Sequence, residues 1–327
     1  MKKIALVLVL VLAAAGCTST AAPVVRQTAA VDQPMPEGAK EVRALDPPSV
    51  DTSCGNPRAS FRPNGPLPAP DALSAFPTVA AIRDHGKLVV GVDQNTYRFG
   101  YRNPETGEIE GFALDVAKEI AKAIFGRADA DVLQLRVLTS KQREDALKAG
   151  DVDLVVHTMT TNCERWGWTD FSAVYYEATQ KVLVKDNFDY QGEQSLAGKK
   201  VCATEKSTSL ARIVNLDVDP KPVGMQVAGW TDCLVMLQQN QVDAVSTDDT
   251  ILAGLADQDP FTKVVNGVDA PEPYAIAVPK KRDDLVRFVN AVLEKIKTDG
   301  TWLRIYDTWM KPLLGPVGAP PVAEYRD

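Results

Sequence analysis

The 327-residue chain has only two histidines, His85 and His157, and its five cysteines form no Cys-x-x-Cys pair. Zinc sites are commonly built from closely spaced cysteine and histidine ligands, so a metal site is not expected. The chain also has no phosphate-binding loop and no nucleophile-elbow motif, and two histidines leave little choice of general base. These absences argue against an enzyme and against a bound metal or cofactor.

Basic residues are too few and too scattered for a nucleic-acid partner. The chain has 36 lysines and arginines against 43 aspartates and glutamates. Loss of Lys2 and Lys3 with a cleaved leader leaves 34 against 43, a net charge of about −9 for the mature chain. Neither nucleic acid nor an anionic membrane surface is an expected partner, and an anionic ligand must be held by local positive charges.

The first seventeen residues have the pattern of an exported lipoprotein. Two lysines precede twelve apolar residues, 4–15, and then Gly16 and Cys17. This run is shorter than the roughly 20 residues of a membrane span and predicts a signal peptide over 1–16. Cys17 after Ala-Ala-Gly resembles the lipobox of bacterial lipoproteins, although Ala14 stands where leucine is commoner. We expect lipid on Cys17 to hold the mature chain on the outer face of a membrane.

The other four cysteines are expected to form disulfides. An even number in an exported chain indicates bridges, and four cysteines allow three pairings. Cys202 and Cys233 lie in the same half of the chain, which favours their pairing and leaves Cys54 with Cys163. The sequence alone does not decide among the three.

The chain divides into a proline-rich leader region and an α/β body. Residues 18–80 hold eleven of the 22 prolines and show no sustained apolar periodicity, so 17–80 is predicted to be a tether. From residue 87 to about 312, strands and helices alternate, which is typical of α/β layers. About 225 residues suit two lobes better than one core. We expect lobe 1 to comprise 81–183 and 273–312, lobe 2 to comprise 184–272, and 313–327 to be a tail.

Hydrophobic periodicity predicts the main elements of the body. Strands are expected at 88–93, 181–184 and 275–278, the last two being the crossings between lobes. The expected helices are 111–124, 143–149, 285–296 and 301–310, the second ending at Gly150 in the manner of a left-handed C-terminal glycine.

Two segments ninety positions apart share one plan, which suggests two equivalent halves. In 146–158 and 235–248, a helix is followed by a stop, a Val-Asp pair and a short apolar strand. Chance similarity is as good an explanation as duplication. In either case Thr158 and Asp248 follow strands at matching places, and ligands of open α/β sheets bind outside the carboxyl ends of strands. Both residues should face a common cleft.

The stretch 151–176, DVDLVVHTMTTNCERWGWTDFSAVYY, sets Arg165 just beyond a strand and a threonine-rich turn. A guanidinium is a planar two-pronged donor that suits a carboxylate, although a single arginine near a strand is usually a surface residue. Several motifs resemble, in this order, bacterial solute-binding proteins of family 3: LVVGVD, GFALDVAKEIAKA, TMTTNCERWGWTDFSAVYYE, KKVCATEKSTSLAR, VDAVSTDDTILAG and DGTWLRIYDTW.

This resemblance covers 87–312 and looks closest to actinobacterial glutamate/glutamine-binding lipoproteins. It implies an α/β, two-lobed periplasmic-binding-protein fold of type II. Each lobe would be a mixed, mostly parallel sheet flanked by helices, with the ligand in the cleft. It also implies a monomeric, lipid-anchored extracytoplasmic receptor for glutamate, aspartate, glutamine or asparagine. The receptor would close by a hinge motion and serve either a membrane permease of an ABC importer or a membrane sensor protein. The alternative is an enzyme on the same scaffold, such as a dehydratase.

An α-amino acid needs a cationic and an anionic partner. By the resemblance, Arg165 and the backbone N–H of Thr160 would hold the α-carboxylate, with Thr208 and Ser209 assisting from the other lobe. Helix capping is the alternative for the loop 207–209. Asp248 with Thr158 would hold the ammonium group, and Asp249 is the alternative to Asp248.

The pocket for the ligand side chain is predicted less narrowly. Its candidate residues are Asp93, Phe99 or Tyr101, Arg102 with Arg98 as competitor, and His157. For Asp93 the alternative is to start a turn, and for Arg102 and His157 the alternative is a surface role. Trp230 and Gln180 are possible wall residues, with core packing as the alternative for each.

Overall fold

The structure is a computed structural model that describes residues 34–45 and 52–327. The predicted signal peptide, Cys17, and residues 18–33 and 46–51 of the predicted tether lie outside the described residues. Within the described ranges, no helix combines the length and the apolar character needed to cross a membrane.

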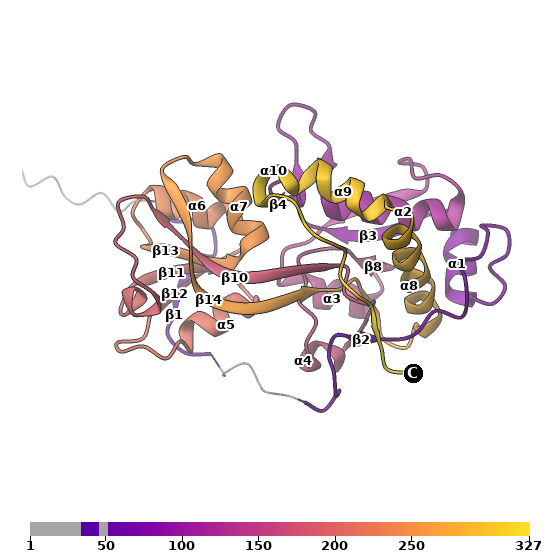
Figure 1. Ribbon diagram of the computed structural model, residues 1–327, viewed down its shortest axis with the longest axis horizontal. Helices are drawn as coiled ribbons and strands as arrows, with labels where there is room; N and C mark the ends of the chain where they lie inside the picture. Colours follow the sequence, from indigo (N-terminus) through magenta and orange to yellow (C-terminus); the bar gives the residue numbers. More distant parts are fainter. Residues whose placement is uncertain (1–33, 46–51) are drawn as a thin grey trace, which may run out of the picture. The chain divides into compact units, whose positions relative to one another are not determined.

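Lobe 1 is built on a five-stranded sheet in the order β7-β3-β8-β15-β9, of which β3 and β8 are labelled in Figure 1. Strand β3 runs parallel to β7 and β8, and β15 runs antiparallel to β8 and β9. The strands are β3 Leu88–Val92, β7 Leu133–Val137, β8 Leu154–Val155, β9 Thr169–Phe171 and β15 Ala277–Pro279. The helices are α1 Pro77–His85, α2 Phe112–Phe125, α3 Gln142–Ala149, α4 Cys163–Trp166, α8 Asp283–Thr298, α9 Thr301–Trp309 and α10 Lys311–Leu314. A small sheet of β4 Asn95–Thr96, β5 Gly100–Arg102 and β6 Ile109–Glu110 completes it.

Lobe 2 is built on a six-stranded sheet in the order β1-β12-β11-β13-β10-β14. Its centre is parallel, because β11 pairs with β12 and β13 in the same direction. The strands are β1 Lys40–Val42, β10 Tyr176–Lys185, β11 Lys200–Thr204, β12 Val223–Val227, β13 Ala244–Asp248 and β14 Thr262–Tyr274. The helices are α5 Thr208–Val214, α6 Trp230–Gln238, α7 Asp249–Gln258 and a 3-10 turn, Glu193–Leu196. The predictions of helices at 111–124, 143–149, 285–296 and 301–310 and of a strand at 88–93 are confirmed to within a few residues by α2, α3, α8, α9 and β3 of lobe 1.

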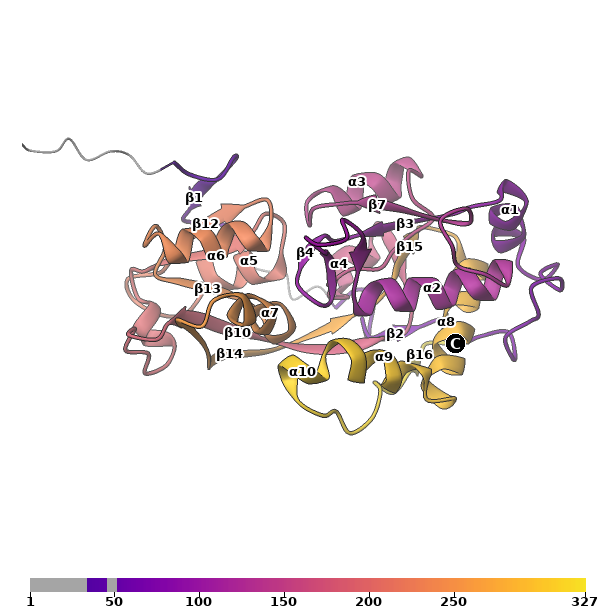
Figure 2. The same ribbon diagram turned by 90° about the horizontal axis from the view of Figure 1, so that it is seen from above.

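The two lobes are joined by β10 and β14, which pair antiparallel from Tyr176 and Tyr274 to Lys185 and Thr262 (Figures 1 and 2). The predicted crossing at 181–184 is misplaced, because that stretch lies inside lobe 2, where β10 also pairs with β13. Likewise, 275–278 leads into β15 of the first sheet. The crossings are the neighbouring, more polar segments, which the search for apolar runs overlooked.

The prediction of a free tether is wrong for 52–80. Residues Ala59–Ser60 (β2) pair with Glu324–Tyr325 (β16), which also fixes the end of the predicted tail (Figure 2). Leu73 and Phe76 are buried in the core of lobe 1. Further upstream, β1 forms an edge strand of lobe 2 against β12. These apolar side chains are spaced irregularly between prolines, so their burial left no periodic pattern in the sequence.

The internal repeat corresponds to matching backbone geometry in the two lobes. The N–H of Asp153 donates to Val89 O, and the N–H of Asp243 donates to Lys200 O, both at 2.8 Å. Each aspartate carboxylate accepts from the N–H of that same strand residue, again at 2.8 Å. This shared arrangement places the two strand ends, and the residues that follow them, in equivalent positions.

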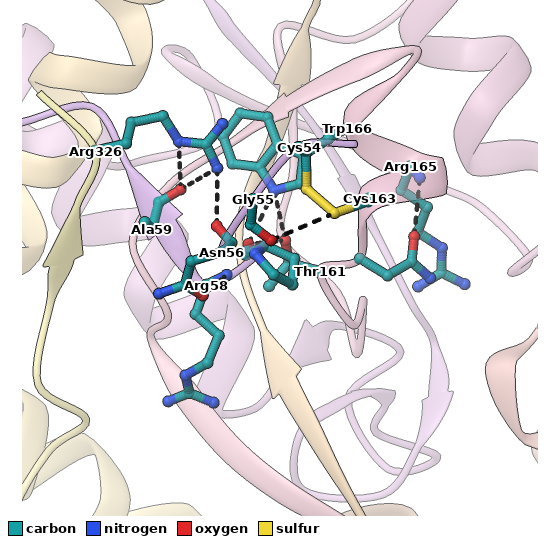
Figure 3. The surroundings of a disulfide bond; sticks show 12 residues. Cys54, Gly55, Asn56, Arg58, Ala59, Thr161, Cys163, Arg165, Trp166 and Arg326 are labelled. Carbon is teal, nitrogen blue, oxygen red and sulfur yellow. Dashed lines mark hydrogen bonds between the residues drawn. A yellow bond between two sulfur atoms is a disulfide. The ribbon is translucent and has the colours of Figure 1, made fainter. Parts of the chain in front are cut away.

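Both favoured disulfides are present. Cys54–Cys163 ties the N-terminal segment to α4, and Cys202–Cys233 ties β11 to α6. Figure 3 shows the first bridge beside Trp166, whose Nε1 donates to Pro57 O at 2.9 Å. The turn that carries Arg165 is therefore held from behind by a covalent bond and an indole contact.

Candidate functional site

A small cavity lies between the lobes, at the carboxyl ends of strands from both sheets. All six residues predicted to hold the backbone groups of a ligand line it: Thr158, Thr160, Arg165, Thr208, Ser209 and Asp248. Its other lining residues are Ser140, Arg143, Ser207, Trp230, Thr247 and Ile251. The open space is about 10 Å³, roughly enough for one water molecule. The two lobes are thus closed on a polar, charged interior.

Arg165 is a buried cation without a neutralising partner. The side chain of Asn162 caps α4 by accepting from the Arg165 N–H at 2.8 Å, which fixes the backbone. The guanidinium donates to Thr160 O at 2.6 Å and to Lys206 O of the other lobe at 3.4 Å. Burial lowers the pKa of Arg165, opposed mainly by the charge of Glu272. No carboxylate of the described chain lies within 4.0 Å of this guanidinium, so it can still pair with an anion.

Asp248 is a buried carboxyl group with one oxygen that has no hydrogen-bond partner in the described chain. It ends β13, and its Oδ2 accepts from the Tyr274 hydroxyl. Its Oδ1 is buried with no hydrogen-bond partner among the residues that the structure describes. Burial, reinforced by the charge of Glu272, raises the pKa of Asp248 well above its ordinary value. Buried polar atoms without partners are costly, so Oδ1 marks a place where a donor is missing.

Arg143 is a second buried cation that the sequence analysis missed. Its Nε donates to Ser140 O at 3.0 Å and its Nη1 to Thr158 O at 3.1 Å. Burial and the nearby Arg165 lower its pKa to about 9, and no described carboxylate pairs with it within 4.0 Å. One signal could have found it: α3 follows β7, so its first turn begins at the edge of the sheet where ligands bind.

The side chains predicted to form the far end of the pocket do not line the cavity. Arg102 is exposed and donates to Gln94 Oε1 at 3.1 Å and Gly107 O at 2.6 Å. Phe99 is buried in an aromatic cluster with Phe112 and Tyr176. Phe99 therefore packs in the core of lobe 1, and Arg102 lies at the surface.

Asp93 and His157 lie behind the cavity wall. The Asp93 carboxylate accepts from Thr96 Oγ1 at 2.6 Å and from the N–H groups of Gln94 and Asn95, so it closes a turn. His157 Nε2 lies 3.8 Å from Asp93 Oδ2, and its Nδ1 lies 3.2 Å from Thr158 Oγ1. Burial lowers the pKa of His157 to about 4. This neutral imidazole supports Thr158 from the side away from the cavity.

Of the three other candidate residues, one lines the cavity and two do not. Trp230 lines the cavity, and its Nε1 is buried without a partner in the described chain. Gln180 is instead bonded to Ser246 and Arg212 and does not reach it. Asp249 accepts from the Thr250 N–H at 2.7 Å and the Thr179 N–H at 3.2 Å, so it caps α7.

The start of α5 combines capping with a place on the wall. Ser207 Oγ accepts from the Leu210 N–H at 3.1 Å, the predicted capping contact. Thr208 Oγ1 donates to Glu272 at 2.9 Å, and Ser209 Oγ donates to Thr247 at 3.1 Å. Glu272, a second residue missed from the sequence, lies on β14 and is fully buried.

The chain matches the family described as bacterial extracellular solute-binding proteins, family 3, over residues 88–312. It belongs to this family. It is 40% identical over 235 residues to the ABC transporter glutamine-binding protein GlnH of Bacillus subtilis, covering 72% of this chain and 85% of the relative. It is 29% identical over 236 residues to the glutamate-binding protein GluB of Corynebacterium efficiens, covering 69% and 79%.

Among solved structures, an ancestral arginine-binding protein bound to glutamine superposes with a TM-score of 0.64 and 32% identity. The match covers 69% of this chain and 98% of that one. The predicted family and the two-lobed α/β fold of type II are thereby confirmed.

Proposed function

We propose that this protein is a lipid-anchored extracytoplasmic receptor for a polar amino acid: glutamate, aspartate, glutamine or asparagine. The main observation behind this proposal is that Arg165 and Asp248 line the same cavity. The first is a buried cation without a carboxylate partner, and the second has a buried oxygen without a donor. A zwitterionic amino acid would supply both missing groups: a carboxylate for Arg165 and an ammonium donor for Asp248. The names of the two relatives, a glutamine-binding and a glutamate-binding protein, support the same class of ligand.

In this proposal the ligand ammonium donates to Asp248 Oδ1, since the Tyr274 hydroxyl already occupies Oδ2. The α-carboxylate accepts from Arg165 and from the backbone N–H groups of Thr160 and Thr208, and from the Ser209 hydroxyl once this turns away from Thr247. Charge-assisted hydrogen bonds of this kind are stronger than neutral ones. Thr158, beside Asp248, completes the ammonium side.

Arg143 takes the role that the sequence analysis gave to Arg102 and His157. Its guanidinium faces the same cavity as Arg165, so it can donate to an oxygen at the far end of the ligand side chain. All four proposed ligands carry such an oxygen, as a carboxylate or an amide. Arg143 therefore selects for polar side chains of this length class and against apolar ones.

Ligand entry requires the lobes to separate, because the closed cavity has room for about one water molecule. The segments where β10 and β14 pair only with each other form the natural hinge, since no other strand of either sheet restrains them. Hinge closure around a ligand is an established type of domain motion. Excluding water on closure strengthens the ion pairs inside.

The receptor is proposed to act as a monomer held by lipid on Cys17, without a cofactor. Its partner is a membrane protein, either the permease of an ABC importer or a membrane sensor. The Bacillus relative is named as part of an ABC transporter, which supports the permease as partner. A gene neighbourhood with a permease and an ATPase would favour import, and a multi-span membrane protein without an ATPase would favour sensing.

Calorimetric titration of the mature protein with the four amino acids tests this proposal. Arg165→Ala should lose measurable binding, because removing one partner of a buried ion pair costs about 3–5 kcal/mol, a factor of roughly 10²–10⁴ in Kd. Arg136→Ala is the matched control, since Arg136 is an exposed arginine of the same lobe, paired with Asp151 at 2.9 Å. Wild-type affinity in Arg165→Ala would reject the assignment. Recovery of chemically unchanged ligand after denaturation separates a receptor from a dehydratase.

A further inference from the structure

Glu272 is a fully buried carboxylate on the hinge strand β14 with three hydrogen-bond donors around it. Its Oε2 accepts from the hydroxyls of Thr160 and Thr208, the latter at 2.9 Å. Its Oε1 accepts from Arg212 Nη1 at 2.5 Å. A buried carboxylate with a cation and two hydroxyls is well satisfied, so it needs no ligand of its own.

The three donors come from opposite lobes. Thr160 belongs to the loop of lobe 1 that leads to Arg165, and it bridges to Tyr274 on β14. Thr208 and Arg212 lie one turn apart on α5 of lobe 2. Arg212 also donates to Gln180 on the other crossing strand. Glu272 thus connects the wall residues of both lobes through the hinge itself.

The position of Glu272 in the hinge makes these contacts sensitive to closure. On β10, pairing with β13 begins at Gln180, which also lies opposite Ala270 on β14. Two residues further along, Glu272 lies between this end of lobe 2 and Tyr274, which contacts lobe 1. A rotation of one lobe relative to the other therefore moves Thr160 and Thr208 apart around Glu272.

We propose that Glu272 is a positioning residue that couples hinge closure to ligand binding. In the closed form its carboxylate holds the hydroxyls of Thr160 and Thr208 together. This turns both hydroxyls away from the ligand and leaves the backbone N–H groups for the ligand carboxylate, a step that rests on the proposed function. The charge of Glu272 is neutralised by Arg212 rather than by Arg165, which stays available for the ligand.

The test compares Glu272→Gln with the wild type in ligand-exchange kinetics and in small-angle X-ray scattering. Loss of hydrogen bonds to a charged group should speed ligand release roughly ten- to hundredfold, whereas the association rate should change less than about twofold, because encounter precedes closure. The ranking of ligands should stay the same, since Arg143, Arg165 and Asp248 are untouched. Scattering should report a larger radius of gyration for the variant than for the wild type. Glu177→Gln is the matched control: Glu177 lies opposite Pro273 on the same strand pair, but its carboxylate is exposed and pairs with Arg58.

A double-mutant cycle guards against a variant that is merely poorly folded. Thr208→Val removes the hydroxyl and keeps the backbone N–H, so it should also speed release. In the double variant with Glu272→Gln, the effect should be smaller than the sum of the two single effects, because both variants disturb the contact between Thr208 and Glu272. Fully additive effects, or a release rate and scattering curve equal to those of the wild type, would overturn the coupling role. If the wild type binds no amino acid, the proposed function fails, and the scattering comparison still decides whether Glu272 holds the hinge closed.

Discussion

Asp248→Asn should make the ligand-free protein more stable at pH 7 while removing ligand binding. Burial and the charge of Glu272 raise the pKa of Asp248, so its ionised form is disfavoured in the folded protein. The folded pKa lies above the unfolded value, and between the two the folded state binds more protons than the unfolded chain. Stability therefore falls as pH rises through this window. Asparagine cannot ionise and escapes that cost.

The expected size follows from the charge, because asparagine still leaves a buried polar atom at this position. Each unit by which the pKa is raised corresponds to about 1.4 kcal/mol of stability lost on ionisation. For a chain of this size, each kcal/mol corresponds to about 2–4 °C in Tm, so the ligand-free variant should melt roughly 3–6 °C above the wild type at pH 7 for each such unit. The gap should shrink towards pH 4, where the wild-type carboxyl is protonated. The gain in Tm on adding ligand, which mass action gives the wild type, should vanish.

Differential scanning calorimetry at pH 7 and pH 4, with and without ligand, measures all of these quantities. Ligand carried through purification must first be removed by unfolding in guanidinium and refolding. Asp249→Asn is the control, because the Asp249 carboxylate caps α7 and its loss should leave binding intact. A ligand-free Asp248→Asn protein that melts below the wild type at pH 7, or that binds ligand normally, would refute the reasoning.

Three further outcomes are expected. In calorimetry, Arg143→Met should weaken binding of glutamate and aspartate by roughly 10²-fold or more, because their side-chain carboxylate becomes an unmatched buried charge. Glutamine and asparagine should lose less affinity, and the preference for all four over apolar amino acids should become smaller. Burial lowers the pKa of His157 to about 4, so its contribution to stability is complete above about pH 6.5 and falls by about 3 kcal/mol as pH drops towards 4. Chemical denaturation of His157→Gln should show a free energy of unfolding that varies less with pH over this range. Replacing Cys54 and Cys163 by serine should lower Tm and also raise Kd, because this bridge holds the turn of Arg165. Replacing Cys202 and Cys233 by serine should lower Tm and leave Kd unchanged.

The elements that the sequence predicts well are those with strong apolar patterns. Helix α2 buries Phe112, Val116, Ile120 and Ile124 at four-residue steps, and such a stripe is readable without any partner. The residues at strand ends were also found, since Thr158 and Asp248 follow short apolar strands in matching halves. Topology alone then brings them to one cleft.

The misses have a common physical cause: they depend on what packs against a segment. The hinge strand β14 reads KVVNGVDAPEPY after Thr262, and its two prolines argue against a strand in any local reading. Its pairing with β10 overrides that preference and buries Glu272. Arg102 was a candidate partner for the ligand side chain, yet it is exposed and donates to Gln94 and to Gly107 O.

What separates the charges of the site from similar neighbouring charges is their lack of partners, which no sequence pattern records. Arg136 and Arg143 are both arginines near the end of β7, yet one pairs with Asp151 at the surface and the other is buried facing the cavity. Asp248 and Asp249 are adjacent, yet one caps a helix and the other keeps a free buried oxygen. Folding normally satisfies buried polar atoms, so an unsatisfied one in a cavity lined by other charged residues indicates a group from outside the chain. That is why a missing donor at Asp248 Oδ1 is stronger evidence for a ligand than the residue type, its spacing or its place at the end of a strand.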